Sequence, residues 1–172
     1  MSNIPAWFER KFEFSFPAEN CPTLLVRLRG TPVRLEEIAR GCPREILVQK
    51  RQGKWSAQEH SGHLLDLEAL WIARVDDFIA DGAELTAADL QNRKTHEADH
   101  NTRPLAQILA DFRCARLELV NRVEAVDPGL FVRTLLHPRL KTPMRLVDHL
   151  YFVAEHDDHH LAQIWELTHV PG

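Results

Sequence analysis

The chain has 172 residues and a formal net charge of -4, with 44% hydrophobic and 27% charged residues. This length suffices to bury one core, so we expect a single domain over residues 1–172. The composition excludes a disordered chain, and basic residues scattered among acidic ones argue against a nucleic-acid partner. No segment approaches the roughly 20 apolar residues of a membrane helix, and residues 1–17 lack the apolar stretch of a signal peptide.

Cysteine and histidine are the two residue types whose numbers carry information. Cys21, Cys42 and Cys114 are an odd number at wide spacing and form no C-x-x-C pair. This usage fits a reducing compartment, and we expect a cytoplasmic protein. Ten histidines are unusual for a chain of this size, so their positions direct the search for a site.

The first part of the chain predicts an extended arm followed by a helix. Residues 12–16 alternate phenylalanine with polar residues, which is typical of an extended segment packed on the body of a protein. Apolar residues then take helical spacing over residues 20–41. Gly30 and Pro32 predict a break or kink within that helix.

The second helix has the clearest start signal in the sequence. Ser56 is a typical N-cap, Glu59 three residues later completes a capping box, and Trp55 is the preceding apolar residue. We expect this helix to run to about Asp81. The polar segment Ala83–Thr102 follows, and both a lid over a site and a solvated connector fit its composition.

Two more helices complete the expected fold. Apolar spacing predicts a third helix over residues 105–126, ended by the turn at residues 127–129. Thr142 and Pro143 supply a cap and a first-turn proline for a fourth helix, which runs to Pro171. No segment shows a convincing strand pattern, so the sequence predicts an all-α four-helix bundle with an extended N-terminal arm.

The last predicted helix carries histidines at the spacing that a metal site requires. His156 and His160 are four residues apart, so their side chains differ by only ~40° around the helix and can converge on one ion. His149 lies within ~20° of the same line and stays open as a ligand, although we rank it as a pocket residue. His159 points ~60° to the other side and is expected at a rim or interface.

A third ligand must come from another helix, and the second helix offers two candidates. His60 lies nearer the centre of the buried stripe, and His63 lies at its edge, so periodicity does not choose between them. A di-iron bundle is excluded. Its paired E-x-x-H motifs match only at Glu97/His100 in the polar connector and at Glu166/His169, where His169 points away from the buried stripe.

Two motifs occur in order along the chain: Trp55-Ser56-x-x-Glu59-x-x-x-His63-Leu64 and Glu155-His156-Asp157-Asp158-His159-His160-Leu161-Ala162-Gln163-Ile164. With Asp148 and the segment His137-Pro138-Arg139-Leu140, they make nearly the whole chain resemble the DinB/YfiT-like superfamily of metal-dependent enzymes. The resemblance implies a DinB-like four-helix bundle, often a homodimer, that holds Zn²⁺ or Ni²⁺ through His63, His156 and His160. It selects His63 over His60.

The implied site suggests an enzyme that acts on a small molecule. Three protein ligands leave a position at which the metal can activate water or a low-molecular-weight thiol, as in a hydrolase or a thiol S-transferase. Glu59 and His149 are the candidate catalytic residues, although the capping box fully explains Glu59. The alternative is a non-catalytic metal-binding stress or interaction protein, against which an open coordination position and a polar pocket would count.

The remaining polar residues near the motifs have less specific interpretations. Residues 157–159 can orient the imidazoles through their second ring nitrogens, or they can form a solvated acidic face. Four others are candidates for the pocket, although each is expected to be an ordinary surface group: Asp66, Glu68, Asn92 and His100.

Overall fold

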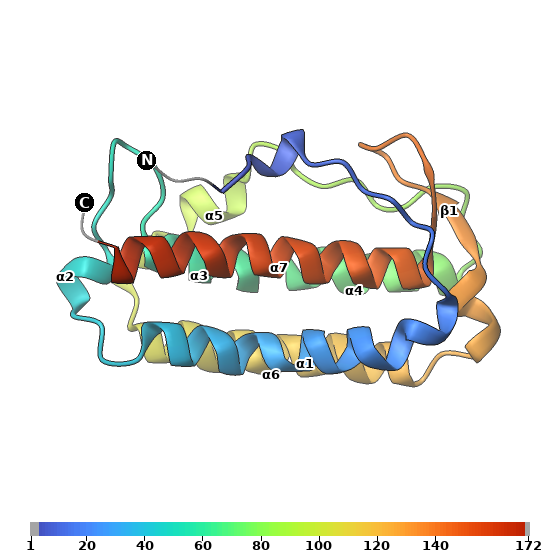
Figure 1. The fold of residues 1–172 in the computed structure, drawn as a ribbon, viewed down its shortest axis with the longest axis horizontal. Helices are drawn as coiled ribbons and strands as arrows, with labels where there is room; N and C mark the ends of the chain where they lie inside the picture. Colours follow the sequence, from blue (N-terminus) through green and yellow to red (C-terminus); the bar gives the residue numbers. More distant parts are fainter. Residues whose placement is uncertain (1–3, 171–172) are drawn as a thin grey trace.

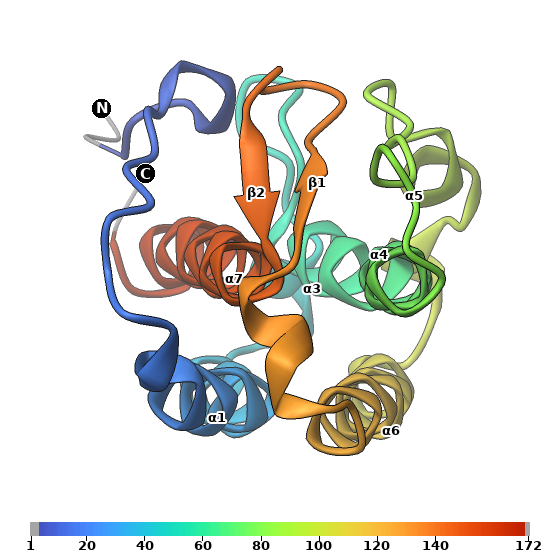
Figure 2. The same ribbon diagram turned by 90° about the vertical axis from the view of Figure 1, so that its right-hand side faces the viewer.

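Four long helical segments lie side by side in the computed structural model, which describes residues 4–170 (Figure 1). They are α1 (Cys21–Ala39), α3 continued by α4 (Ala57–Asp66 and Glu68–Ile79), α6 (Leu105–Glu124) and α7 (Leu146–His169). Viewed from one end, they occupy the four corners of a bundle (Figure 2). The predicted four-helix bundle is therefore confirmed.

Shorter elements connect the long helices, and two of them are strands. Strand β1 (Thr134–Leu136) pairs with β2 (Pro143–Arg145) in an antiparallel hairpin, in which Leu135 lies opposite Met144. The other short elements are η1 (Trp7–Glu9), η2 (Ala18–Asn20), α2 (Arg44–Leu47), α5 (Arg93–Glu97), η3 (His100–Thr102) and η4 (Pro128–Val132).

The core lies between the helices, because each helix buries one apolar stripe. Leu28 of α1, Phe78 of α4, Leu119 of α6 and Val153 of α7 are fully buried in it. Removing each such side chain from water contributes about 1.5–3 kcal/mol. The bundle is therefore a well-packed base on which the other elements rest.

The bundle has two layers, α1 with α6 and α3/α4 with α7. A third layer covers the side formed by α3/α4 and α7 (Figures 1 and 2). It consists of the N-terminal arm, the connector that contains α5, and the β1–β2 hairpin. Phe12, Phe14 and Phe16 pack against the core, and Arg145 donates a 3.0 Å hydrogen bond to the Phe16 carbonyl. The extended arm is thus confirmed, and this layer encloses space above the two helices.

Helix α1 continues through Gly30 and Pro32, so of the predicted break or kink, the break is wrong. Proline lacks the N–H that would bond the carbonyl four residues earlier, which is that of Leu28. The buried guanidinium of Arg116 donates to this carbonyl at 3.2 Å. A side chain from α6 thus satisfies the group that Pro32 leaves free.

The second predicted helix begins where expected and is interrupted once. Ser56 and Glu59 form the predicted capping box, with each side chain bonded to the other residue's backbone N–H. The helix is interrupted at Leu67, between α3 and α4, and α4 ends at Ile79. The start signal is therefore confirmed.

The predicted start of the fourth helix is wrong. Pro143 opens strand β2, and the helix begins at Leu146, where Asp148 accepts a 2.9 Å hydrogen bond from the Arg145 backbone N–H. The hairpin also contradicts the expectation that no strands form, because three-residue strands are too short to show a period. Helix α7 ends at His169, and the predicted end at Pro171 lies outside the described residues.

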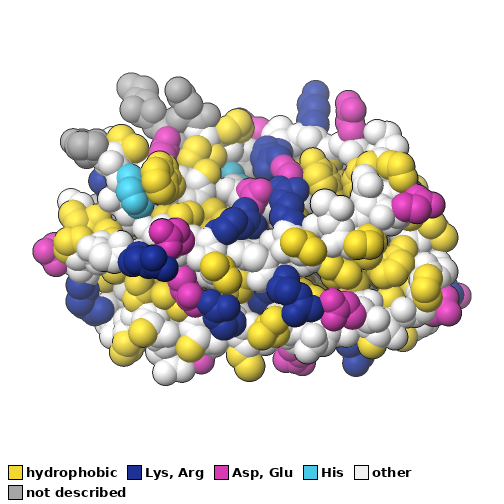
Figure 3. Space-filling model, turned by 60° about the horizontal axis from the view of Figure 1, so that its bottom comes forward, with side chains coloured by type: hydrophobic (Ala, Val, Ile, Leu, Met, Phe, Trp, Pro, Cys, Tyr) yellow, Lys and Arg dark blue, Asp and Glu magenta, His cyan; other side chains and the backbone are white. Residues whose placement is uncertain are grey.

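Basic and acidic side chains are interleaved on the face that carries α1 (Figure 3). Arg27 and Arg34 of α1 pair with Asp158 of α7 at 2.5 and 2.6 Å, and Arg10 of the arm pairs with Glu155. These pairs join α1, α7 and the arm, and the visible face carries no extended patch of one sign. Within residues 4–170, no helix is long and apolar enough to cross a membrane.

Candidate metal centre

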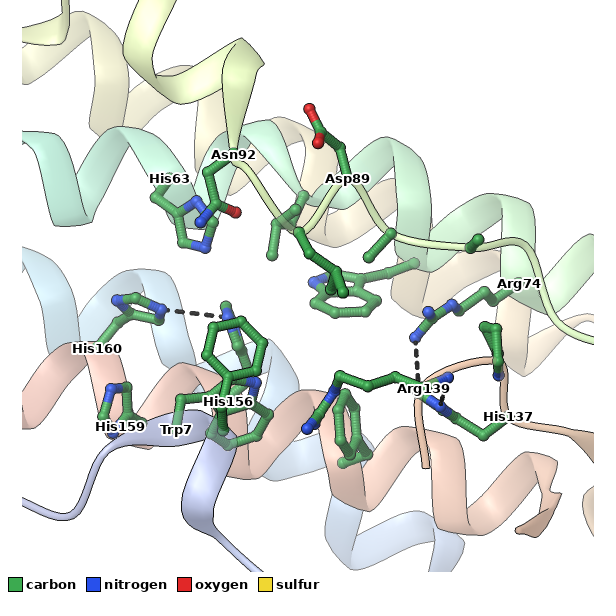
Figure 4. A pocket seen from close by; sticks show the side chains of 18 of the residues that line it. Trp7, His63, Arg74, Asp89, Asn92, His137, Arg139, His156, His159 and His160 are labelled. Atoms are coloured by element: carbon green, nitrogen blue, oxygen red, sulfur yellow. Dashed lines mark hydrogen bonds between the residues drawn. The ribbon is translucent and has the colours of Figure 1, made fainter. Parts of the chain in front are cut away.

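Three buried histidines meet on the bundle face beneath the third layer (Figure 4). His63 comes from α3, and His156 and His160 come from consecutive turns of α7. Each offers one ring nitrogen, and the three nitrogens lie within 4.8 Å of one another. The structure thus brings together the three histidines named as ligands on sequence grounds.

The two α7 histidines converge as their spacing predicts. The Nε2 atoms of His156 and His160 are 3.1 Å apart. Two nitrogens bound to one tetrahedral zinc ion at about 2.0–2.1 Å lie about 3.3 Å from each other. Their separation therefore suits two ligands of one ion.

A chain of hydrogen bonds orients His63. Its Nδ1 lies 3.0 Å from Oγ1 of Thr95 in α5, and that hydroxyl donates to Oδ2 of Asp66 at 2.9 Å. Because the hydroxyl's proton goes to Asp66, its oxygen accepts from His63 Nδ1–H. The Nε2 lone pair of His63 is then free for a metal.

The same carboxylate anchors the connector to α3. His100 is fully buried, and its Nε2 lies 2.8 Å from Oδ2 of Asp66. The His100 ring approaches Gly62 so closely that a Cβ added there would lie 2.2 Å from its Cγ. Glycine at position 62 therefore allows the connector to pack tightly over the helix that carries His63.

The histidines of the cluster are held in the neutral form. Burial lowers the pKa of His63 to about 4, and it lowers the pKa values of His156 and His160 well below their ordinary value. Repulsion among the imidazoles adds to this effect. A metal ligand must be a neutral imidazole, so the site is ready to bind without first losing protons near neutral pH.

The donor set therefore fits a divalent ion. On His156, Nδ1 has no hydrogen-bond partner among residues 4–170 and can carry the ring proton, which leaves Nε2 for a metal. On His160, Nδ1 lies 2.8 Å from Nδ1 of His60, which can accept its proton and leave Nε2 for a metal. Three neutral nitrogens from two helices make a cation site, and imidazole ligands suit zinc and nickel among other metals.

The cluster lines one end of a cavity of about 350 Å³. Its floor is formed by α3/α4 and α7, and its walls include Trp7 of the arm, Trp55 before α3, and Asn92 of the connector. Residues 87–90 also line it. The Ala83–Thr102 segment is therefore more than a solvated connector, since part of it bounds the cavity.

His60 and His159 flank the three clustered histidines. His60 is less buried than His63, the reverse of the order that periodicity favours. The connector explains this reversal, because it covers the side of α3 that a simple bundle would expose. His159 lines the cavity and packs against Trp7, with ring centroids 5.8 Å apart.

The two candidate catalytic residues lie away from the cavity. His149 is fully buried, packs against Trp71 and Phe78, and does not line the cavity, so its expected pocket position is corrected. Trp71 itself lines the cavity, and its ring centroid lies 5.8 Å from that of His149. Glu59 forms the capping box with Ser56 and pairs with Lys50 at 2.7 Å, which agrees with its structural interpretation.

Several residues expected at the surface are buried instead. Asp66 and His100 belong to the chain that orients His63, and Glu68 is 2% exposed and pairs with Arg116 at 2.6 Å. Asp157 is fully buried on the other side of Arg116, so it forms no solvated acidic face. Asn92 is half-buried and lines the cavity.

Sequence reasoning missed the residues that the third layer contributes. Thr95 appeared only as one polar residue of the connector, and no local pattern marks Trp7. Arg74 and the turn residues His137 and Arg139 also line the cavity. For His137 and Arg139, the only signal in the sequence was their place in the segment 137–140, which contributes to the family resemblance.

Comparisons with known proteins agree with the four-helix bundle fold. The family model of the DinB superfamily matches residues 27–164. YfiT from Bacillus subtilis, described as a probable metal-dependent hydrolase with an unusual four-helix bundle topology, superposes with a TM-score of 0.80 at 21% identity. The superposition covers 92% of this chain and 91% of that protein. Among curated proteins, no match was found.

Proposed function

The chain belongs to the DinB superfamily, and we propose that it is a metal-dependent enzyme whose ion is held by His63, His156 and His160. The observation that carries this proposal is the convergence of three neutral ring nitrogens within 4.8 Å at the end of a cavity. A structural zinc site has four protein ligands and is closed. Three ligands beside a cavity favour catalysis over a purely structural or binding role.

The proposed reaction is hydrolysis or transfer of a thiol to a small-molecule acceptor. A divalent ion in such a site supplies Lewis acidity that lowers the pKa of a water molecule or a thiol. The residues around it keep the imidazoles oriented, and Trp7, Trp55 and Trp71 give the cavity an aromatic lining. Zinc and nickel are the proposed metals, and the homodimer remains a prediction.

Metal analysis of the purified protein tests the proposed ligands. We expect about one zinc or nickel ion per chain in the wild type and loss of that ion in His63→Ala, His156→Ala and His160→Ala. His169→Ala is the matched control, because it removes an exposed imidazole at the end of α7 that lies outside the cluster. Near-stoichiometric metal in all three ligand variants would overturn the proposed site.

Activity assays then separate an enzyme from a metal-binding protein. The metal-loaded protein would receive low-molecular-weight thiols with a chlorinated aromatic or epoxide acceptor, and in parallel ester and amide substrates. We expect turnover that disappears after chelation and returns with the metal. Retained metal without any turnover across this panel would favour the non-catalytic alternative.

Thr95→Val is expected to weaken metal binding about 10–100-fold, because His63 loses the group that fixes its proton on Nδ1. The affinity would be measured by competition with a chromophoric chelator. Thr102→Val is the matched control, since this nearby surface hydroxyl donates to the Asp99 carbonyl and has no other partner among residues 4–170. Equal affinities in the two variants would contradict an orienting role for Thr95.

A further inference from the structure

The end of the cavity opposite the histidines is basic (Figure 4). Arg74 of α4 reaches it from the floor, and His137 and Arg139 reach it from the turn between β1 and β2. At 1.5 Å per residue, the Cα atoms of His63 and Arg74 are separated by about 16 Å along α3/α4. The basic group is therefore distinct from the proposed metal centre but shares its cavity.

Neither arginine has an acidic partner within the described part of the chain. Arg74 is 2% exposed, and its Nε donates to the Thr86 carbonyl at 2.9 Å. Asp77 acts on Arg74 only electrostatically, since its Oδ2 accepts from the Thr86 N–H at 2.5 Å. Asp89 also lines the cavity, but it is exposed and pairs with Arg93 at 3.0 Å. Buried cations normally have a counter-ion in direct contact, and Arg74 has none among the described residues.

Two hydrogen-bond donors face each other in this group. Nδ1 of His137 accepts from the backbone N–H groups of Arg139 at 3.2 Å and Leu140 at 3.1 Å. The proton of the neutral ring must then be on Nε2, which lies 3.3 Å from Nη1 of Arg74. Both atoms carry hydrogen, and an anionic oxygen beside them could accept from both.

Further donors in the cavity wall lack acceptors. Nη2 of Arg139 and Nε1 of Trp71 are buried and have no hydrogen-bond partner among residues 4–170. Burial lowers the pKa of Arg74 to about 10, which leaves it cationic at neutral pH. Its guanidinium lies 5.4 Å from the Trp71 ring, so an aromatic surface supports the charge.

We propose that Arg74, His137 and Arg139 form an oxyanion subsite, and that the substrate is a small molecule with a carboxylate or phosphate group and an apolar body. Leu67, Trp71 and Phe152 line the space between the two ends and contact the apolar body. The proposal deepens the proposed function, on which it rests for placing the reacting end of the substrate at the histidines. Anion binding itself needs no metal.

The test compares anionic probes with a neutral isostere at constant ionic strength. Binding of 3-phenylpropionate, phenyl phosphate and 3-phenylpropionamide to the metal-free protein would be measured by calorimetry. We expect at least one anion to bind about tenfold or more tightly than the amide, because each charge-assisted hydrogen bond contributes strongly. The two anions distinguish a carboxylate site from a phosphate site.

Variants of the two arginines test whether these side chains cause the preference for anions. Arg74→Met and Arg139→Met are each expected to weaken anion binding about tenfold or more while leaving amide binding unchanged. Arg113→Met is the matched control, since Arg113 lies on α6 and pairs with Glu36 outside the cavity. Arg139 is half-buried, so its variant keeps the test valid should Arg74→Met fail to fold.

In the wild type, two results would overturn the subsite: no saturable binding of either anion, or equal affinity for anion and amide. Anion affinity unchanged in both variants would do the same. Metal analysis is independent of these measurements. If the ligand variants kept their metal but the protein still preferred anions, the proposed function would fall and the subsite would stand. If the ligand variants lost their metal but the protein did not prefer anions, only the metal centre would stand.

Discussion

Replacing Arg116 by alanine is expected to lower the free energy of unfolding by about 3–5 kcal/mol. Arg116 is fully buried on α6, between Glu68 of α4 and Asp157 of α7, and it also donates to the Leu28 carbonyl of α1. The variant would leave two buried carboxylates without a counter-ion. It would also free the carbonyl that lacks a helical partner because of Pro32.

Urea unfolding of Arg116→Ala and Arg113→Ala would measure this loss. Arg113 lies one turn earlier on α6 and pairs with Glu36 near the surface, so its removal should cost less than about 1 kcal/mol. Burial raises the pKa of Glu68 to about 7, against the opposing effect of Arg116. Without Arg116, protonation of Glu68 removes its buried negative charge. The loss in the free energy of unfolding should therefore be larger at pH 8, where Glu68 is charged, than at pH 6. Similar losses in both variants would contradict the proposed role.

The helices could be predicted where local signals and the final structure agree. Ser56 and Glu59 make a cap that depends only on neighbouring residues, so the start of α3 was predicted correctly. Thr142 and Pro143 carry an equally good signal, yet pairing with β1 holds this segment as a strand. Pro32 should break α1, but Arg116 comes from a different helix to satisfy the free carbonyl. Contacts between distant segments decided both exceptions.

The residues of the candidate site also differ in whether one segment alone could reveal them. His156 and His160 could be identified from helical spacing, because both lie on one helix. His63 required the family resemblance, since burial by the connector reverses the order that periodicity gives for His60 and His63. Thr95 comes from this connector. The oxyanion group likewise joins α4 to a hairpin turn, and no pattern within one segment can predict such a meeting.

The stability of the chelator-treated protein is expected to fall as the pH drops from 6.5 to 4. Burial lowers the pKa of His63 to about 4 and that of His137 to about 3, from an ordinary value of 6.5. In this window the unfolded chain takes up protons that the folded chain refuses, so acid favours unfolding. Each such histidine contributes up to about 1.4 kcal/mol per pH unit.

Urea titrations at half-unit steps between pH 7.5 and 4 would give the slope of stability against pH. His137→Gln should reduce this slope, because one titrating group with a depressed pKa is removed. His169→Gln, which removes a solvent-exposed imidazole at the end of α7, is the matched control. If the free energy of unfolding of the wild type did not change with pH, the buried histidines would accept protons without destabilising the fold. The site could then not be described as a set of imidazoles held neutral by the fold.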